Sequence, residues 1–159
     1  MKIKNRHLLK NSEIKEISQS LENKFGFNFF KNRKVERGEI GDREFLLIDG
    51  EPLLSKFEDV FFPNVKGALK FNLEKNYLTV DQGAVPYVIN GADIMAPGVV
   101  DVDYDLIEGD LAIVMEEEHN KPFAVVRLIK DGADILELDK GKVAKNIHHI
   151  RDELWEKID

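Results

Sequence analysis

Apolar residues recur at helical spacing early in the chain, where Ile14, Ile17 and Leu21 would share one face of a helix. Ser12 stands at the start of this pattern and Gly26 at its end. Serine is a preferred helix cap, and glycine commonly ends a helix because it accepts a left-handed backbone. The pattern therefore predicts an N-terminal helix that begins near Ser12 and stops at Gly26.

The rest of the first half is typical of short strands. Residues 44–48 form an apolar run, Asp49-Gly50 predicts a tight turn, and a second strand begins at Pro52. An apolar cluster follows between residues 57 and 63. Because no low-complexity linker separates this half from the next, we expect the two halves to pack closely.

The second half predicts many short strands with turn signals between them. A short helix over residues 84–89 follows the first of these strands, with Asp81 as its cap and Asn90-Gly91 as its end. Alternating apolar residues then indicate further strands, and the chain ends in a closing turn. The expected strands are 77–80, 94–102 with a break at Pro97-Gly98, 110–116, 122–129 and 142–150, and the closing turn is 152–155. This arrangement is typical of a small β-barrel.

Charge is unevenly distributed along the chain of 159 residues. The net charge is −7, but residues 1–75 hold 15 Lys and Arg against 12 Asp and Glu, whereas residues 76–159 hold 8 against 18. Such asymmetry indicates two units with different roles, and it limits any contact with RNA to a local surface. No apolar run approaches the roughly 20 residues that span a membrane, and the N-terminal residues do not resemble a signal peptide. We therefore expect a cytoplasmic protein with no membrane partner.

Enzymatic motifs are missing from the sequence. Cysteine is absent, and neither a nucleophile motif nor a phosphate-binding glycine loop occurs. His148 and His149 are adjacent, so on a strand they would point to opposite faces and not share a metal. The alternating Asp101, Asp103 and Asp105 lack the glycine and terminal glutamate of a calcium loop. We expect no catalysis, no cofactor and no metal.

A set of ordered motifs in the second half resembles the PUA domain. It begins with Asp81-Gln82-Gly83-Ala84, continues through residues 88–99 and Glu108-Gly109-Asp110, and ends in residues 141–155. The match runs in order over about residues 76–156. The resemblance implies an RNA-binding fold built as a mixed β pseudo-barrel.

The first half resembles one subfamily of PUA proteins. Residues 48–54 and 61–65, leading into Val80-Asp81, are similar to the malignant T-cell-amplified sequence family and its archaeal relatives. That family places a small α/β domain before the PUA domain and works in translation re-initiation and recycling. The resemblance implies an α+β protein with an N-terminal domain at 1–75 and a PUA domain at 76–159. It also implies structured RNA, rRNA or tRNA, as a ligand, and the small ribosomal subunit and a second translation factor as partners.

The RNA surface implied by the resemblance lies at the helix-to-strand junction around Gly91 and along the last strand. Gly91 and Ala92 leave the backbone bare, so its amides and carbonyls can approach 2′-hydroxyls and base edges. Lysines on the last strand and basic side chains of the first half are interpreted as phosphate contacts. The candidate RNA-binding residues are Gly91, Ala92, Asp93, Met95, Lys142, Lys145, His148, Lys66, Lys70 and Arg37.

Structural roles and two rival functions remain open at this point. Gly91 also fits a simple helix end, Met95 fits a core position, and Asp93 fits a loop-holding role. One rival function is an RNA-binding accessory subunit of a separate tRNA- or rRNA-modifying enzyme. The other is a protein-interaction module that no longer binds RNA, which the acidic second half favours.

Overall fold

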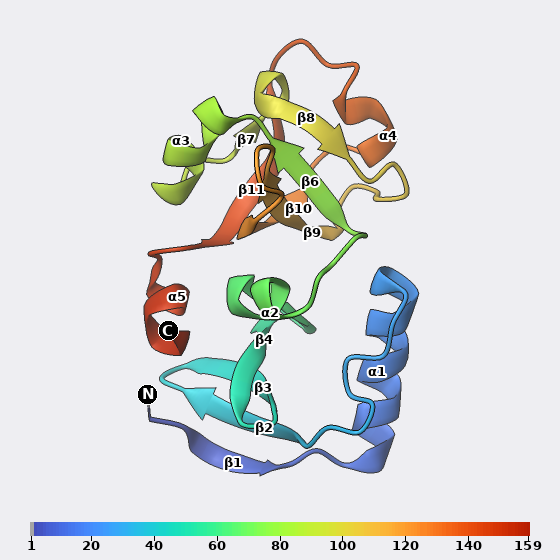
Figure 1. Ribbon diagram of the computed structural model, residues 1–159, viewed down its shortest axis with the longest axis vertical. Helices are drawn as coiled ribbons and strands as arrows, with labels where there is room; N and C mark the ends of the chain where they lie inside the picture. Colours follow the sequence, from blue (N-terminus) through green and yellow to red (C-terminus); the bar gives the residue numbers. More distant parts are fainter. Residues whose placement is uncertain (1) are drawn as a thin grey trace.

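The first half of the chain folds into an antiparallel sheet with one long helix along its side (Figure 1). The structure is a computed structural model that describes residues 2–159. Its five strands pair in sequence order, β1-β2-β3-β4-β5. The elements are β1 (Lys4–Leu8), α1 (Asn11–Phe25), β2 (Val35–Ile40), β3 (Arg43–Ile48), β4 (Glu51–Phe57), β5 (Val60–Pro63) and α2 (Val65–Lys70).

The predicted helix and turn are present, and one detail of the helix start is wrong. Gly26 ends α1 with a φ of 82°, and Asp49 and Gly50 turn β3 into β4 with φ values of 52° and 85°. Ser12 does not cap α1, because the helix begins one residue earlier and Lys10 precedes it without a side-chain cap. The glycine that ends the helix and the Asp49-Gly50 turn were therefore predicted correctly, whereas the serine cap was not.

Three elements of this half carry no clear apolar pattern and were not predicted. Strand β1 is exposed along its whole length, and β2 is rich in charged residues. Helix α2 begins at the buried side chain of Asn64, which accepts a hydrogen bond from the Gly67 amide at 2.9 Å. The Asn64 amide also donates to the Pro52 carbonyl and the Ser55 hydroxyl at 2.9 Å each. Asn64 thus joins α2 to β4 by tertiary contacts that no local pattern reveals.

The second half forms a six-stranded mixed sheet in the order β7-β11-β10-β9-β6-β8. Only the β6–β9 pair within it is parallel. The predicted strands are present, with the expected break at Pro97-Gly98. The elements are β6 (Tyr77–Val80), a 3₁₀ turn (Gln82–Ala84), α3 (Val85–Ile89), β7 (Ile94–Met95), a 3₁₀ turn (Ala96–Gly98), β8 (Val99–Val102), β9 (Leu111–Glu116), β10 (Pro122–Leu128), α4 (Gly132–Ile135), β11 (Lys142–His149) and α5 (Glu153–Ile158).

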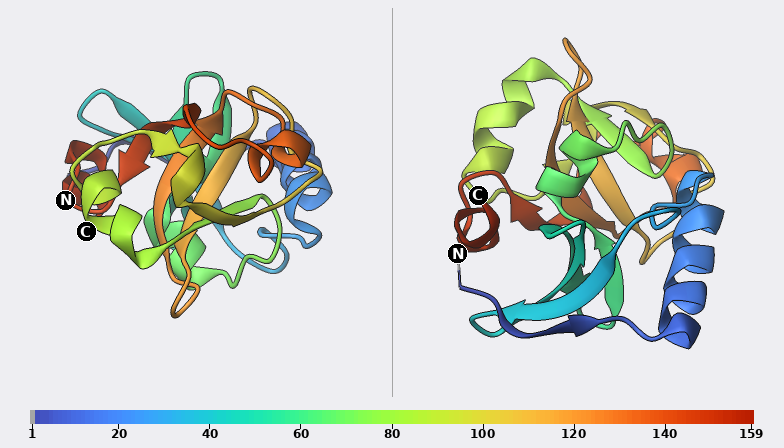
Figure 2. Two further views of the ribbon diagram at one scale, coloured as in Figure 1. Left: turned by 90° about the horizontal axis from the view of Figure 1, so that it is seen from above. Right: turned by 60° about the horizontal axis from the view of Figure 1, so that its bottom comes forward.

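The predicted closing turn is a helix that returns to the first half. Asp152 caps α5 by accepting a hydrogen bond from the Trp155 amide at 2.7 Å. Leu154 and Ile158 are buried in the core of the N-terminal unit, and Lys66 donates to the Ile158 carbonyl at 3.0 Å. In Figures 1 and 2 both termini therefore lie together, on the side opposite α1. Among residues 2–159, no helix combines the length and apolar character needed to cross a bilayer.

The second sheet separates two apolar cores, one on each of its faces. On β9, Ile113 belongs to the core shared with the N-terminal unit, whereas Ala112 and Val114 belong to the core beneath α3 and α4. On β10, Val125 and Val126 divide in the same way. This alternation follows from the two-residue period of a strand, and it buries the central strands on both faces.

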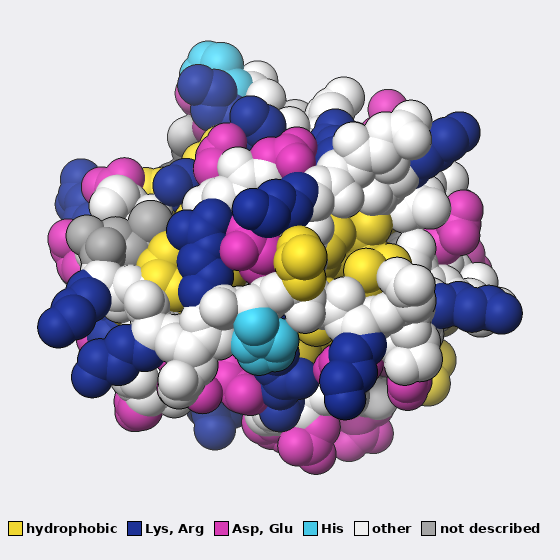
Figure 3. Space-filling view, turned by 90° about the horizontal axis from the view of Figure 1, so that it is seen from below, with side chains coloured by type: hydrophobic (Ala, Val, Ile, Leu, Met, Phe, Trp, Pro, Cys, Tyr) yellow, Lys and Arg dark blue, Asp and Glu magenta, His cyan; other side chains and the backbone are white. Residues whose placement is uncertain are grey.

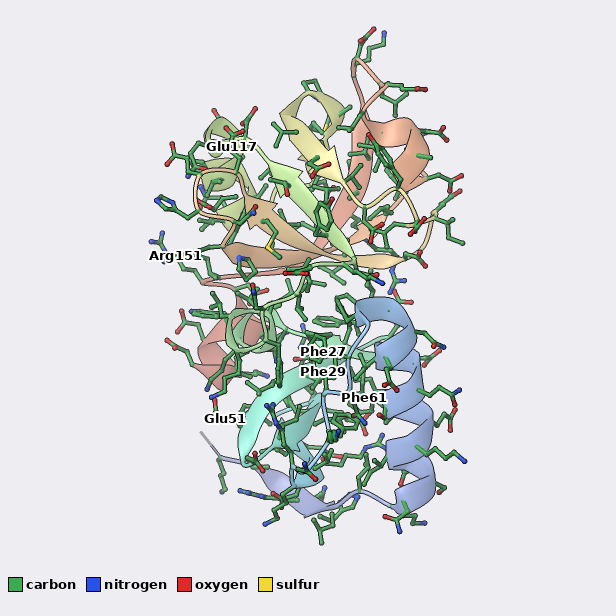
Figure 4. All side chains as sticks on the ribbon, turned by 45° about the vertical axis from the view of Figure 1, so that its right-hand side comes forward. Phe27, Phe29, Glu51, Phe61, Glu117 and Arg151 are labelled. Atoms are coloured by element: carbon green, nitrogen blue, oxygen red, sulfur yellow. The ribbon has the colours of Figure 1, made fainter. Side chains whose placement is uncertain are left out.

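Aromatic side chains fill the N-terminal core beside α1. The ring centres of Phe27 and Phe29 lie 4.4 Å apart (Figure 4). Phe25 meets Phe29 edge-on, with 5.5 Å between the ring centres. The guanidinium of Arg37 lies 5.3 Å from the centre of the half-buried Phe61 ring. These contacts stabilise the N-terminal unit through apolar burial and cation–π attraction.

His148 was predicted to face RNA, and the structure places it in the interior between the two units. Its side chain is fully buried, with Nδ1 2.9 Å from Asp152 and Nε2 accepting a hydrogen bond from the Val65 amide at 3.2 Å. The two contacts fit a neutral imidazole whose proton is on Nδ1. Because no part of the side chain reaches the surface, direct contact with RNA is excluded for this conformation. His148 instead links β11 to the start of α2.

The buried histidine makes stability depend on pH. Burial lowers the pKa of His148 below its ordinary value, and the hydrogen bond to Asp152 offsets this only in part. The unfolded chain therefore binds more protons as pH falls below the ordinary histidine pKa of about 6.5. The resulting stability is complete above that pH and is lost below it.

We predict that the free energy of unfolding falls between about pH 7 and pH 5, and that His148→Gln weakens this dependence because the amide does not titrate. Urea unfolding of both proteins across this range measures the effect. His7→Gln, at an exposed histidine, is the matched control and keeps the wild-type dependence. Equal pH slopes for wild type and His148→Gln would contradict the assignment.

Candidate nucleic-acid interface

The junction between α3 and β7 exposes bare backbone. Asn90 follows α3, and Gly91 then adopts a φ of 96°, a left-handed conformation that disfavours other residues. The Gly91 amide donates to the Val88 carbonyl at 2.9 Å, and the Ala92 amide to the Tyr87 carbonyl at 3.0 Å. Gly91 and Ala92 are both exposed. Gly91 therefore ends the helix, both amides are used within the chain, and the Gly91 carbonyl remains as an exposed acceptor.

Asn146 on β11 holds this junction in place through three hydrogen bonds. Its side-chain amide donates to the carbonyls of Val88 and Ala92, at 3.0 Å each, and its backbone amide donates to Asp93 at 2.8 Å. The Asn146 contacts thus hold the end of α3 and the start of β7 on the same strand. Sequence reasoning missed Asn146, because a lone asparagine on a strand carries no signal of such a role.

Asp93 forms an ion pair within the junction. Its carboxylate lies 2.8 Å from the ammonium of Lys142, and this hydrogen bond lowers the pKa of Asp93 below its ordinary value, while burial opposes the shift. Lys145, exposed on the same strand, also favours the charged form of Asp93. The pairing offsets the charge of Asp93, and Lys145 forms no ion pair among residues 2–159, so Asp93 itself does not make this face repel phosphate.

An apolar cleft of about 390 Å³ opens beside the junction. Val88 and Ile94 line it, as do Tyr87 and Met95, whose side chains stay 70% and 48% exposed. Met95 therefore lies at the surface and is not a core residue. Exposed aromatic and thioether side chains beside an apolar cleft can contact the face of an unstacked base.

The candidate residues come together only in part. Gly91, Ala92, Asp93 and Met95 share one surface with the exposed lysines of β11, Lys142 and Lys145. Figure 4 shows Arg151 projecting from the same unit after β11, and Glu117 above it on the β9–β10 hairpin. His148 is the one candidate that the structure removes from the surface altogether.

The three candidates of the first half lie outside this surface. Arg37 is paired with Glu13 at 3.3 Å and Glu44 at 2.9 Å, on the strand next to β1. Lys66 and Lys70 lie on α2, between the two sheets in Figure 1. Figure 3, a view onto the outer face of the N-terminal unit, shows Lys and Arg intermixed with Asp and Glu and no continuous basic patch. Within residues 2–159, no three side chains of the metal-binding types converge on one point.

Comparisons with known proteins divide the chain between two family models. The PUA domain model matches residues 76–150, and a model described as a domain of unknown function (DUF1947) matches residues 5–71. The chain is also similar to a solved structure of a hypothetical protein from Pyrococcus horikoshii OT3. That likeness has a TM-score of 0.88 and 33% identity, and it covers 97% of this chain and 99% of that one.

Relatives over most of the chain point to one family. An uncharacterized protein of Methanocaldococcus jannaschii is 38% identical over 98% of each chain. Translation machinery-associated protein 20 of Schizosaccharomyces pombe is 32% identical over 74% of this chain and 68% of its own length. Malignant T-cell-amplified sequence 1-A of Xenopus laevis is 31% identical over 70% of this chain, which spans 64% of that relative. The resemblance seen in the sequence is confirmed, and the chain belongs to the PUA-domain family of the malignant T-cell-amplified sequence proteins and their archaeal relatives.

Proposed function

We propose that this protein binds structured RNA of the small ribosomal subunit through the α3–β7–β11 surface, and acts in translation initiation or recycling. The family relationship supports RNA binding and a connection with translation. The role is one of binding and positioning without chemistry, in the cytoplasm. In this proposal residues 1–75 and 76–159 are two domains, and the first orients the second or recruits a second factor.

One observation carries the proposal: bare backbone, an apolar cleft and an unpaired lysine adjoin on a single surface. The exposed Gly91 carbonyl, which accepts no hydrogen bond among residues 2–159, offers an acceptor to sugar hydroxyls and base amino groups. The cleft lies within the range of small-ligand pockets, about 300–1,000 Å³, and Tyr87 beside it supplies a stacking face. Lys145 supplies a phosphate contact. Together these groups suit an RNA that presents at least one unstacked nucleotide.

We predict that Gly91→Glu lowers binding to small ribosomal subunits by at least about tenfold, because it places a carboxylate where a phosphate backbone approaches. Co-sedimentation of the purified protein with the subunits measures this. Gly109→Glu is the matched control, since Gly109 also has a left-handed φ, of 94°, but lies in the β8–β9 loop. Equal loss in both variants would contradict the proposed surface. Binding to free tRNA without binding to subunits would favour the accessory subunit of a modifying enzyme.

The charge of the surface predicts a weak dependence of RNA affinity on salt. Lys142 is already paired with Asp93, so few cations remain to displace counterions. With about one to three phosphate contacts, the slope of log affinity against log salt is expected at roughly −1 to −3. Binding to a subunit-derived RNA fragment across a salt series gives this slope. A value near −6 or steeper would require a broad basic surface instead, which this proposal does not include.

A further inference from the structure

A second surface of the PUA unit, on the side away from α3, concentrates negative charge. It consists of residues 101–110 and 131–139, which hold nine Asp and Glu and no Lys or Arg. The two segments pack together: the Glu108 amide donates to Asp131 at 2.8 Å, and the Gly132 amide to the Leu106 carbonyl at 2.8 Å. A Cβ on Gly132 would come within 2.4 Å of the Asp103 carbonyl, so only glycine permits this contact. We call these two segments the acidic surface.

The negative charges of the acidic surface are only weakly compensated within the described chain, where Lys24 attracts Asp110 without forming an ion pair with it. Among residues 2–159, none of the nine carboxylates has a cationic side chain within 4.0 Å, whereas Glu44 in the N-terminal unit pairs with both Arg37 and Lys56. Some of the nine fix the loop by accepting backbone amides, as Asp103 does from Asn76 at 2.8 Å. Others have no hydrogen-bonding partner in the described part of the chain, namely Asp105, Glu108, Asp134, Glu137 and Asp139.

Large apolar side chains stand exposed among these carboxylates. Tyr104 and Ile107 are each 60% exposed on the β8–β9 loop, and Leu136 is 39% exposed at the end of α4. Exposed apolar side chains beside unpaired charge of one sign are typical of a surface that a partner covers. Lys24 and Lys75 border the acidic surface where it faces α1, and burial lowers the pKa of Lys24.

We propose that the acidic surface docks a basic, amphipathic segment of a partner protein. Lysines and arginines of such a segment complement the unpaired carboxylates, and its apolar residues cover Tyr104, Ile107 and Leu136. RNA is repelled by the same carboxylates. In Figure 1, α3 and α4 lie on opposite sides of the PUA unit, so the partner and RNA can bind together. This inference does not depend on the proposed RNA surface.

The probe that tests the docking surface is a fluorescein-labelled synthetic helix of leucine and lysine whose leucines lie on one face. Fluorescence anisotropy compares the full-length wild type with the double variant Ile107→Ser, Leu136→Ser. The matched control is Leu8→Ser, Leu69→Ser, since Leu8 and Leu69 are 64% and 50% exposed on β1 and α2. We expect the first variant to bind the peptide about tenfold more weakly, because apolar burial is lost, and the control to bind within about twofold of wild type.

Three results would overturn the docking proposal. The first is equal peptide affinity for wild type and the Ile107→Ser, Leu136→Ser variant. The second is a loss of peptide affinity in the Leu8→Ser, Leu69→Ser control as large as that in the Ile107→Ser, Leu136→Ser variant. The third is a wild-type dimer in light scattering that this variant loses, which would assign the surface to a second copy of the chain. RNA affinity unchanged in the variant, together with weaker peptide binding, supports the proposal whether or not the RNA surface is correctly placed.

Discussion

Strand β9 is buried on both faces, and the rest of the molecule is arranged around that constraint. Ile113 packs against the N-terminal unit while Ala112 and Val114 pack beneath α3 and α4, so neither side of the central strands is free for a ligand. The return of α5 to the N-terminal core and the contact of His148 with the Val65 amide join the units further. A rigid connection follows, because separating the units would expose apolar surface and leave a buried histidine unpaired.

The two proposed binding surfaces therefore lie at the periphery of the second sheet. The edge pair β7–β11 carries the proposed RNA surface, where Asn146 holds the Val88 and Ala92 carbonyls in place and the Gly91 carbonyl remains exposed. The β8–β9 loop and α4, on the other side, carry unpaired carboxylates. In the proposed arrangement, nine of the 18 acidic residues of the PUA unit lie in the acidic surface away from the junction. At the junction, Asp93 is paired with Lys142, and Asp81 also lines the cleft.

Much of this arrangement could be predicted from the sequence, and the failures have physical causes. Alternation and turn residues gave the strands of the second half, and the family resemblance gave the junction. Strands β1 and β2 were not predicted, because strands rich in charged residues show no alternation of apolar and polar positions. His148 was misplaced because alternation separates the two faces of a strand without saying that both are covered. Asn146 and Asn64 act through tertiary contacts, which no local pattern encodes.

Two exposed tyrosines on opposite sides of the PUA unit allow the most direct measurement. Tyr87 lines the cleft beside the junction, and Tyr104 lies in the acidic surface. Each is replaced in turn by the photoreactive analogue p-benzoylphenylalanine, and the protein is irradiated with small ribosomal subunits. The account predicts crosslinks to ribosomal RNA from position 87 and none from position 104. Crosslinks to RNA from position 104, with none from position 87, would contradict it.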